Sequence, residues 1–148
     1  MKYYGIVGLL GRAYENSQKF IEKELKEKGI ADLLPSHGAL LAVLFRNGGT
    51  MRMSDIAKML KRDKSTITTL AAKMEATGYI SRCQCEKDGR AFNISLTEKA
   101  YNIKVLFDEI SEKLISATYK NMSEDEENML KTLLEKVKDN FSGFGDNR

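Results

Sequence analysis

The sequence predicts a mainly α-helical fold with a small β-hairpin, and two patterns support this fold class. Residues 53–60 and 64–77 each place apolar side chains at helical spacing, and three polar residues separate the two segments. After Gly78 the apolar period changes to two, and a charged turn divides the next residues into a pair of short strands. Helix, turn, helix and hairpin in this order are typical of a winged helix-turn-helix, here flanked by N- and C-terminal helices.

Length, composition and charge agree with this fold. A chain of 148 residues, 42% of them hydrophobic, can form one domain with a buried core. We expect a single domain over 1–148, with a winged lobe at 33–97 and helical dimerisation regions at 1–32 and 98–148. Residues 50–90 hold nine Lys and Arg against five Asp and Glu, a net charge of +4, whereas the whole chain carries +3. The positive charge therefore lies where DNA phosphates would need it.

Composition also argues against several classes of protein. Two cysteines do not make a disulfide framework, and no run of about 20 apolar residues could span a membrane. The apolar run at 5–11 leads directly into charged residues, so we expect no signal peptide and a cytoplasmic location. The sequence has one histidine and shows no catalytic triad, phosphate-binding loop or metal-ligand spacing. It therefore predicts neither an enzyme nor a metal or cofactor site.

The helices before the helix-turn-helix follow from periodicity and helix stops. Apolar residues at threes and fours predict a helix over about 3–28, which Gly29 ends. Three glycines between residues 5 and 11 indicate either an irregular start or the close approach of a second helix. Pro35 favours the start of the next helix, which Asn47 and two following glycines end.

Two further helices are expected after the hairpin. Thr97 can cap the first, and Ser123 with Glu126 forms a capping box for the second. The apolar face of the first includes Tyr101, Val105, Phe107, Ile110 and Leu114. The outer helices carry more apolar side chains than the lobe can cover, which predicts a symmetric homodimer, with a compact monomer as the alternative.

The helix at 64–77 has two contrasting faces. Asp63 is placed to cap it, and Gly78 to end it. Its buried stripe is predicted to consist of Ile67, Leu70, Ala71 and Met74. Its opposite side carries Ser65, Thr69, Ala72 and Ala76, flanked by Thr68 and Lys73. Such hydroxyls and methyls can read base edges in a major groove, while Lys64 and Lys73 suit phosphates; a solvated, Thr-rich face is the alternative.

The hairpin is predicted to pair residues 79–85 with 92–96 through an Asp-Gly turn. Lys87 and Arg90 lie at its tip, where they can reach a DNA backbone or a minor groove. Asp88 can hold the Arg90 guanidinium in one orientation. The alternative is a plain charged turn.

From Ile56 to Thr97 the chain resembles the multiple-antibiotic-resistance regulator (MarR) family of transcription factors. The shared features are Ile-Ala at 56–57, Lys-Ser-Thr at 64–66, Gly-Tyr-Ile-Ser-Arg at 78–82, Asp88 with Arg90, and Leu-Thr at 96–97. The resemblance implies a twofold dimer that places one recognition helix per subunit in successive major grooves of a pseudo-palindromic double-stranded DNA operator. The helices on both sides match the family's dimerisation layout in position and length.

The resemblance also implies roles for particular residues. It adds Thr66 and Arg82 to the expected DNA contacts, and it makes Asp88 and Arg90 a salt-bridged pair of which Arg90 touches DNA. It implies that small, often aromatic or phenolic ligands bind between the dimerisation helices and the lobe and loosen DNA binding. Tyr14 and His37 are candidates to line such an effector pocket, although a structural role is the simpler interpretation of each.

Two cysteines in the hairpin suggest a second kind of sensor, although two cysteines without a role are the simpler interpretation. In a strand, Cys83 and Cys85 would project to the same face about 7 Å apart at Cα, too far for a comfortable disulfide. The leading hypothesis is therefore a homodimeric, sequence-specific transcriptional repressor that a small molecule modulates. The alternatives are a thiol-responsive regulator that uses Cys83 and Cys85, and a winged-helix protein-interaction module without DNA readout.

Overall fold

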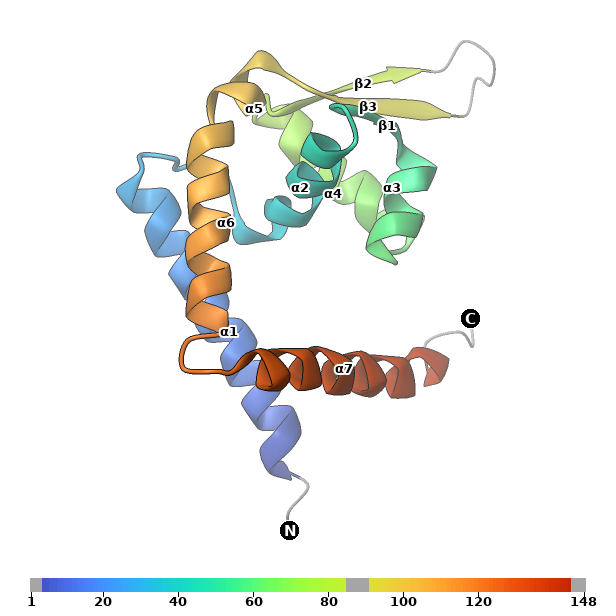
Figure 1. Cartoon of the computed structure of the whole chain (residues 1–148). Coiled ribbons are helices and arrows are strands. Elements are labelled where there is room, and N and C mark those ends of the chain that lie inside the picture. Colours follow the sequence, from blue (N-terminus) through green and yellow to red (C-terminus); the bar gives the residue numbers. More distant parts are fainter. Residues whose placement is uncertain (1–3, 85–90, 145–148) are drawn as a thin grey trace. The chain divides into compact units, whose positions relative to one another are not determined.

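The computed structural model describes residues 4–84 and 91–144 of the chain (Figure 1). The chain divides into two compact units, Met1–Ser111 and Glu112–Arg148. The helices of the first unit are α1 (Tyr4–Glu27), the 3-10 turn η1 (Pro35–His37), α2 (Gly38–Arg46), α3 (Met53–Leu60), α4 (Lys64–Ala76) and α5 (Glu98–Asn102). Its strands are β1 (Thr50–Arg52), β2 (Ile80–Gln84) and β3 (Phe92–Leu96). The predicted fold class, mainly helical with a small wing, is confirmed.

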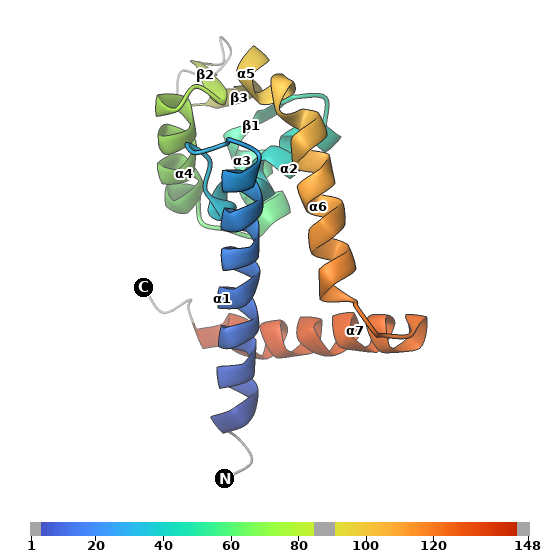
Figure 2. The ribbon, with the colours of Figure 1, turned by 90° about the vertical axis from the view of Figure 1, so that its left-hand side faces the viewer.

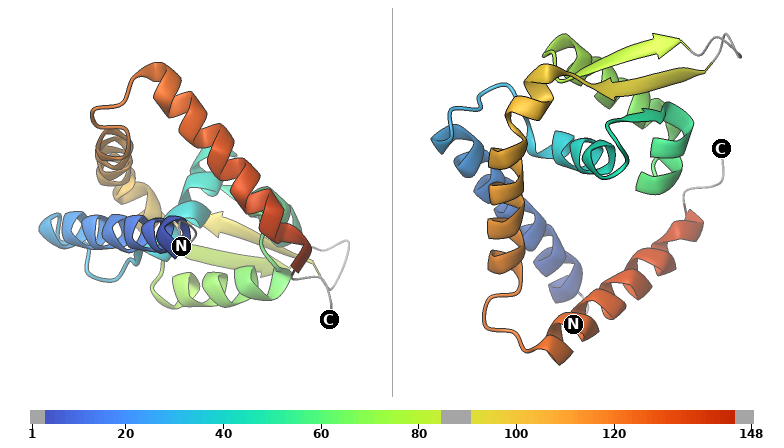
Figure 3. Two further views of the ribbon diagram at one scale, coloured as in Figure 1. Left: turned by 90° about the horizontal axis from the view of Figure 1, so that it is seen from below. Right: turned by 45° about the horizontal axis from the view of Figure 1, so that its top comes forward.

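The three strands form one antiparallel sheet in the order β1-β3-β2. Ile94 in the middle of β3 pairs with Met51 on one side and with Arg82 on the other. Figure 3 shows α4 lying alongside the β2–β3 hairpin. The hairpin was predicted from the sequence, whereas β1 was missed because three residues are too few to show an alternating pattern.

The core of the first unit lies between α2, α3, α4 and the sheet, which Figure 2 shows grouped together. Its largest fully buried side chains are Tyr79, Leu40, Leu41, Leu44, Ile56, Ile67, Met74, Ile80 and Ile94. These residues come from all three helices and from the hairpin. The core therefore fixes α4 as part of a helix-turn-helix and holds the hairpin against it.

The N-terminal helix differs in one respect from the expectation. α1 is a regular helix from Tyr4, so the predicted irregular start is wrong. Apart from its chain neighbours and the backbone of its own helix, a Cβ built at Gly5 or Gly11 would meet no atom of the described residues within 4 Å, which leaves the close approach of another helix as a prediction. The first turn after Pro35 is a 3-10 turn, and the α-helix proper begins at Gly38.

The single helix expected after Thr97 is two helices, so that expectation is wrong. Thr97 caps α5 through a bond from the Ala100 amide at 3.4 Å, as predicted. The helix then breaks at Ile103 and resumes as α6 (Lys104–Thr118). Beyond the break, the Phe107 ring packs against Phe45, with 5.4 Å between ring centroids.

The second unit contains the end of α6, α7 (Glu124–Phe141) and the short turn η2 (Ser142–Phe144). The predicted capping box is present: Glu126 N donates to Ser123 Oγ at 3.2 Å, and Ser123 N donates to Glu126 Oε2 at 2.8 Å. α7 has no buried residue, and its exposed large apolar side chains include Met129, Leu133, Leu134 and Phe141. Over the described residues, no helix is both long enough and apolar enough to cross a membrane.

Candidate nucleic-acid interface

The turn between α3 and α4 is built without the glycine that such turns usually contain. Lys61 takes the left-handed conformation, with φ of 50°. Its amide donates to the Lys58 carbonyl at 3.2 Å, and the next amide, of Arg62, donates to Ala57 at 3.0 Å. These bonds satisfy the last carbonyls of α3 and offset the roughly 1–2 kcal/mol that a side chain costs in this conformation.

The start of α4 corrects one detail of the prediction. Asp63 occupies the N-cap position, but its carboxylate accepts no capping hydrogen bond; only its backbone carbonyl does, from the Ile67 amide at 3.1 Å. The Asp63 side chain is exposed. At the other end Gly78 has φ of 84°, which confirms it as the residue that ends the helix.

The two faces of α4 are as predicted. Ile67, Ala71 and Met74 are buried, and Leu70 is half-buried. All six residues of α4 expected to contact DNA are exposed: Lys64, Ser65, Thr66, Thr68, Thr69 and Lys73. The helix therefore presents a face of small polar groups flanked by two cations.

The threonine hydroxyls on this face are already engaged as donors. Thr68 Oγ1 donates to the Lys64 carbonyl at 2.8 Å, and Thr69 Oγ1 donates to the Ser65 carbonyl at 3.0 Å. Each hydroxyl has one proton, so what remains available is its oxygen lone pairs and the neighbouring methyl group. The face is thus suited to accept hydrogen bonds from base amino groups and to touch thymine methyls.

Of the hairpin residues expected to contact DNA, Arg82 lies within the described part of the chain. Arg82 on β2 already forms an ion pair within the protein, because its Nε donates to Glu75 Oε2 at 2.8 Å. This ion pair raises the pKa of Arg82 and lowers that of Glu75. The predicted contacts Lys87, Asp88 and Arg90, together with Cys85, lie outside the described residues.

The remaining cysteine, Cys83, is exposed on β2, opposite Asn93. Across residues 4–84 and 91–144, no group of three or more His, Cys, Asp and Glu side chains is arranged to hold a metal ion. The thiol-responsive alternative rests on the Cys83–Cys85 pair and stays a prediction.

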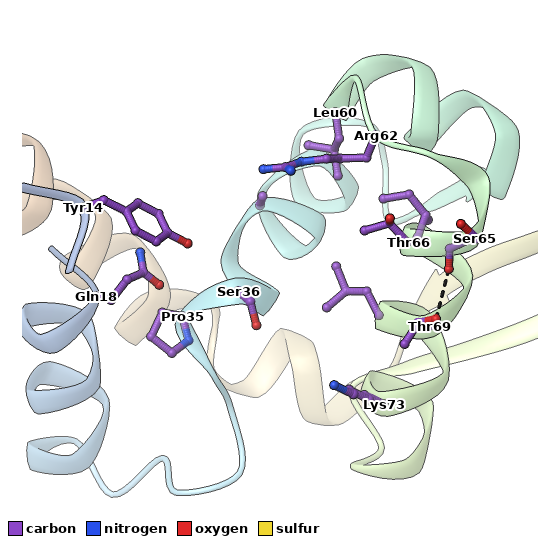
Figure 4. A pocket seen from close by; sticks show the side chains of 13 residues that line it. Tyr14, Gln18, Pro35, Ser36, Leu60, Arg62, Ser65, Thr66, Thr69 and Lys73 are labelled. Atoms are coloured by element: carbon purple, nitrogen blue, oxygen red, sulfur yellow. Dashed lines mark hydrogen bonds between the residues drawn. The ribbon is translucent and has the colours of Figure 1, made fainter. Parts of the chain in front are cut away.

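A cleft of about 770 Å³ lies between α1, η1 and α4. Figure 4 shows Tyr14 and Gln18 on one side of it, and Ser65, Thr69 and Lys73 on the other. Its lining consists of Tyr14, Gln18, Pro35, Ser36, Ala39, Leu60, Arg62, Ser65, Thr66, Ile67, Thr69, Leu70 and Lys73. The lining includes two cations and no carboxylate, so the cleft favours an anionic occupant.

The structure separates the two residues predicted to line an effector pocket. Tyr14 is 64% exposed and lines the cleft. His37 is buried and is not part of the lining. Its Nδ1 accepts a hydrogen bond from the Leu34 amide at 3.1 Å, whereas its Nε2 has no partner among the described residues. Burial, assisted by the charge of Lys73, lowers the pKa of His37.

Sequence reasoning missed Gln18, Ser36 and Arg62 as lining residues. Gln18 and Arg62 are 44 residues apart in the chain, and no motif links them. The four-residue spacing from Tyr14 to Gln18, which places both on one face of α1, could have indicated Gln18 once Tyr14 was chosen.

Comparison with known proteins supports the interpretation of this fold as that of a DNA-binding regulator. A sequence model of the MarR family matches residues 31–91. The transcriptional regulator SarZ of Staphylococcus aureus strain USA300 is 31% identical over 113 residues, which span 76% of this chain and 74% of SarZ. A mutant MarR from Escherichia coli in complex with operator DNA has a TM-score of 0.74 at 20% identity, covering 89% of this chain and 92% of that one. An organohalide-sensing regulator with bound 2,4-dichlorophenol has a TM-score of 0.85 at 18% identity, covering 100% and 86%.

The helix-turn-helix, the antiparallel wing and the exposed polar face of α4 define a winged-helix transcription regulator that binds DNA. The similarity to SarZ, over more than two thirds of both chains, identifies the family. The chain belongs to the MarR family of transcriptional regulators. The family consists of transcriptional regulators.

Proposed function

We propose that this protein is a homodimeric repressor that binds a pseudo-palindromic operator and that an aromatic anion, bound in the cleft, weakens this binding. The exposed hydroxyl face of α4 carries the proposal. Thr68 and Thr69 offer acceptors and methyl groups, and Lys64 and Lys73 flank them with positive charge. A surface needed only for solubility would not use threonines, which are mediocre helix formers.

The homodimer is supported by apolar surface in both units. α1 exposes Ile6, Val7 and Leu9, each more than half accessible to solvent. In the second unit, α7 buries none of its residues. Exposed apolar stripes of this length are usually covered by a partner, and a twofold pair is the commonest arrangement. A dimer would carry two copies of α4 and would read two half-sites about 34–36 Å apart.

Ligand modulation is supported by an overlap between the cleft and the exposed face of α4 that we expect to contact DNA. We call this face, made up of Lys64, Ser65, Thr66, Thr68, Thr69 and Lys73, the reading face. Ser65, Thr66, Thr69 and Lys73 belong to both. A ligand seated there withdraws these side chains from DNA, so ligand and operator compete directly. The 2,4-dichlorophenol bound to the organohalide-sensing neighbour is an aromatic of the size that such a cleft holds. A repressor of this kind acts where the chromosome is, so a cytoplasmic location is part of the proposal.

A random-oligonucleotide binding selection tests the DNA part. We expect one half-site, repeated with twofold symmetry at a fixed spacing. Thr69→Glu should abolish specific binding, because a carboxylate would face base edges and phosphates, while light scattering still shows a dimer. Glu27→Gln, at the C-terminal end of α1 and outside the set of expected DNA contacts, serves as a control that should bind normally. Recovery of no preferred sequence would contradict the proposal.

The ligand part is tested by titrating 2,4-dichlorophenol at several DNA concentrations, at an alkaline pH where the phenol is ionised to the aromatic anion that the proposal names. Direct competition predicts that the apparent Kd for the operator rises in proportion to ligand without a plateau, since no ternary complex forms. A plateau would show that protein, ligand and DNA bind together, and the competition mechanism would then be wrong. Lys73→Gln should weaken the effect of the ligand, because it removes one of the two cations of the cleft.

A further inference from the structure

A cluster of polar side chains lies at the C-terminal end of α4, away from both the reading face and the cleft. Lys99 on α5 donates to the Thr77 carbonyl at 2.6 Å and forms an ion pair with Asp32. The Lys99 ammonium also lies 4.5 Å from the centroid of the Tyr79 ring. Tyr79 in turn donates its hydroxyl to Asp32 Oδ1 at 2.5 Å. We call Asp32, Tyr79 and Lys99 the clasp.

The clasp joins segments that are far apart in the sequence. Asp32 lies in the loop between α1 and η1, and Lys99 lies on α5, which leads into α6. The chain enters the winged lobe through the first of these segments and leaves it through the second. Both meet at the end of the recognition helix, where Lys99 binds the Thr77 carbonyl. An ion pair from Lys28 to Glu109, at 2.8 Å, also links the turn that follows α1 to α6.

The three members depend on one another. Tyr79 is 1% exposed, so its hydroxyl needs an acceptor inside the protein. Asp32 supplies that acceptor, and its pKa is lowered by the hydrogen bonds from Lys99 and Tyr79. Thr97 Oγ1 adds a bond to the Gly78 carbonyl at 2.6 Å, next to the carbonyl that Lys99 holds. The Thr77 and Gly78 carbonyls, which follow α4, are thus bonded to Lys99 and Thr97, and Lys99 in turn links them to Asp32 in the loop after α1.

The Asp32–Lys99 pair is a weak source of folding stability, because both side chains are 44% exposed. A pair of this kind is better suited to orient one helix relative to its neighbouring segments than to stabilise the fold. Here it would orient α4 relative to the two segments that connect the lobe to α1 and to α6.

We propose that Asp32 and Lys99 are positioning residues that set the half-site spacing which the dimer accepts on DNA. The inference rests on the proposed function, since it requires a dimer formed through the outer helices. Neither residue needs to touch DNA. They act by holding each recognition helix at one angle to the helices that would join the two subunits.

The test uses the operator recovered by the selection and versions of it with one base pair added or removed between the half-sites. One base pair changes the separation by about 3.4 Å and the direction by about a tenth of a turn. The measured quantity is the ratio of Kd for the altered operator to Kd for the original one. The full-length protein is used throughout, with circular dichroism and light scattering to verify fold and dimer.

We expect Asp32→Asn and Lys99→Met to lower this ratio by about tenfold, the size of a typical coupling between sites. The double variant should resemble either single one, because the two residues act as one unit. Lys99→Arg keeps the positive charge, so it should retain most of the wild-type ratio of Kd values. Glu27→Gln is the matched control: it removes a carboxylate whose partner, Lys23, lies on the same helix at 3.9 Å, and it should leave the ratio unchanged.

A ratio equal to that of the wild type in folded, dimeric Asp32→Asn and Lys99→Met variants would overturn the inference and leave the proposed function intact. Unfolding of both variants would also overturn it, because the pair would then be needed for the fold itself. If the wild type selects no operator at all, the proposed function fails and the inference falls with it.

Discussion

Replacement of Lys73 by Gln gives a quantitative test of how α4 meets DNA. Lys73 is exposed on the flank of the reading face, and among the described residues no carboxylate pairs with it. Its ammonium is therefore available to a phosphate. Each phosphate contact contributes about 0.9 to the slope of log K against log salt, so loss of two such contacts in a dimer should reduce the slope by about 1.8.

This change of slope is large enough to measure. Between about 50 and 200 mM salt, the wild type should lose roughly tenfold more affinity than the variant. Fluorescence anisotropy with a labelled operator at five or six salt concentrations gives the slope directly. Lys23→Gln, an exposed lysine of α1 that is paired with Glu27, is the control and should keep the wild-type slope. An unchanged slope in Lys73→Gln would refute the placement of this residue beside a phosphate.

Two further predictions concern charge. Glu75→Gln should tighten operator binding by about two- to fivefold, measured by the same assay, because it frees the Arg82 guanidinium from its ion pair for a phosphate; a weaker complex would count against the Arg82 contact. His37 is the only histidine of the chain, and its pKa is lowered in the folded state. As pH falls below about 6.5, the unfolded chain therefore binds the proton first, and folding stability is lost. The Tm of the wild type should fall between pH 7.5 and 5.5 more steeply than that of His37→Asn, and equal slopes would show that His37 is not the group responsible.

Local patterns in the sequence were sufficient for most of the fold. The capping box at Ser123, the stop at Gly78 and the two faces of α4 involve residues within a few positions of one another, and each is present as predicted. Such features depend on backbone geometry that is the same in any context, so periodicity and residue type identify them. The exposure of the expected DNA contacts on α4 followed from the same periodicity, except for Thr66, which the family resemblance added.

Features that depend on distant residues escaped prediction. β1 pairs Met51 with Ile94 across the sheet, and beyond the break at Ile103 the Phe107 ring packs on Phe45. The cleft likewise combines side chains of α1, η1 and α4, of which only Tyr14 had been chosen from the sequence as a pocket residue. None of these contacts leaves a regular pattern in the residues around it.

The sequence by itself determined that this chain has a helix-turn-helix with a hydroxyl-rich outer face and a following hairpin. The tertiary structure decided what those hydroxyls still offer, since the protons of Thr68 and Thr69 are used within α4. It also decided that His37 is buried while Tyr14 faces the cleft, and that Asp32 meets Lys99 across 67 residues of chain. The physical reason is the range of the interactions: helical period and capping act over a few residues, whereas a cleft or an ion pair forms only where the fold brings remote segments together.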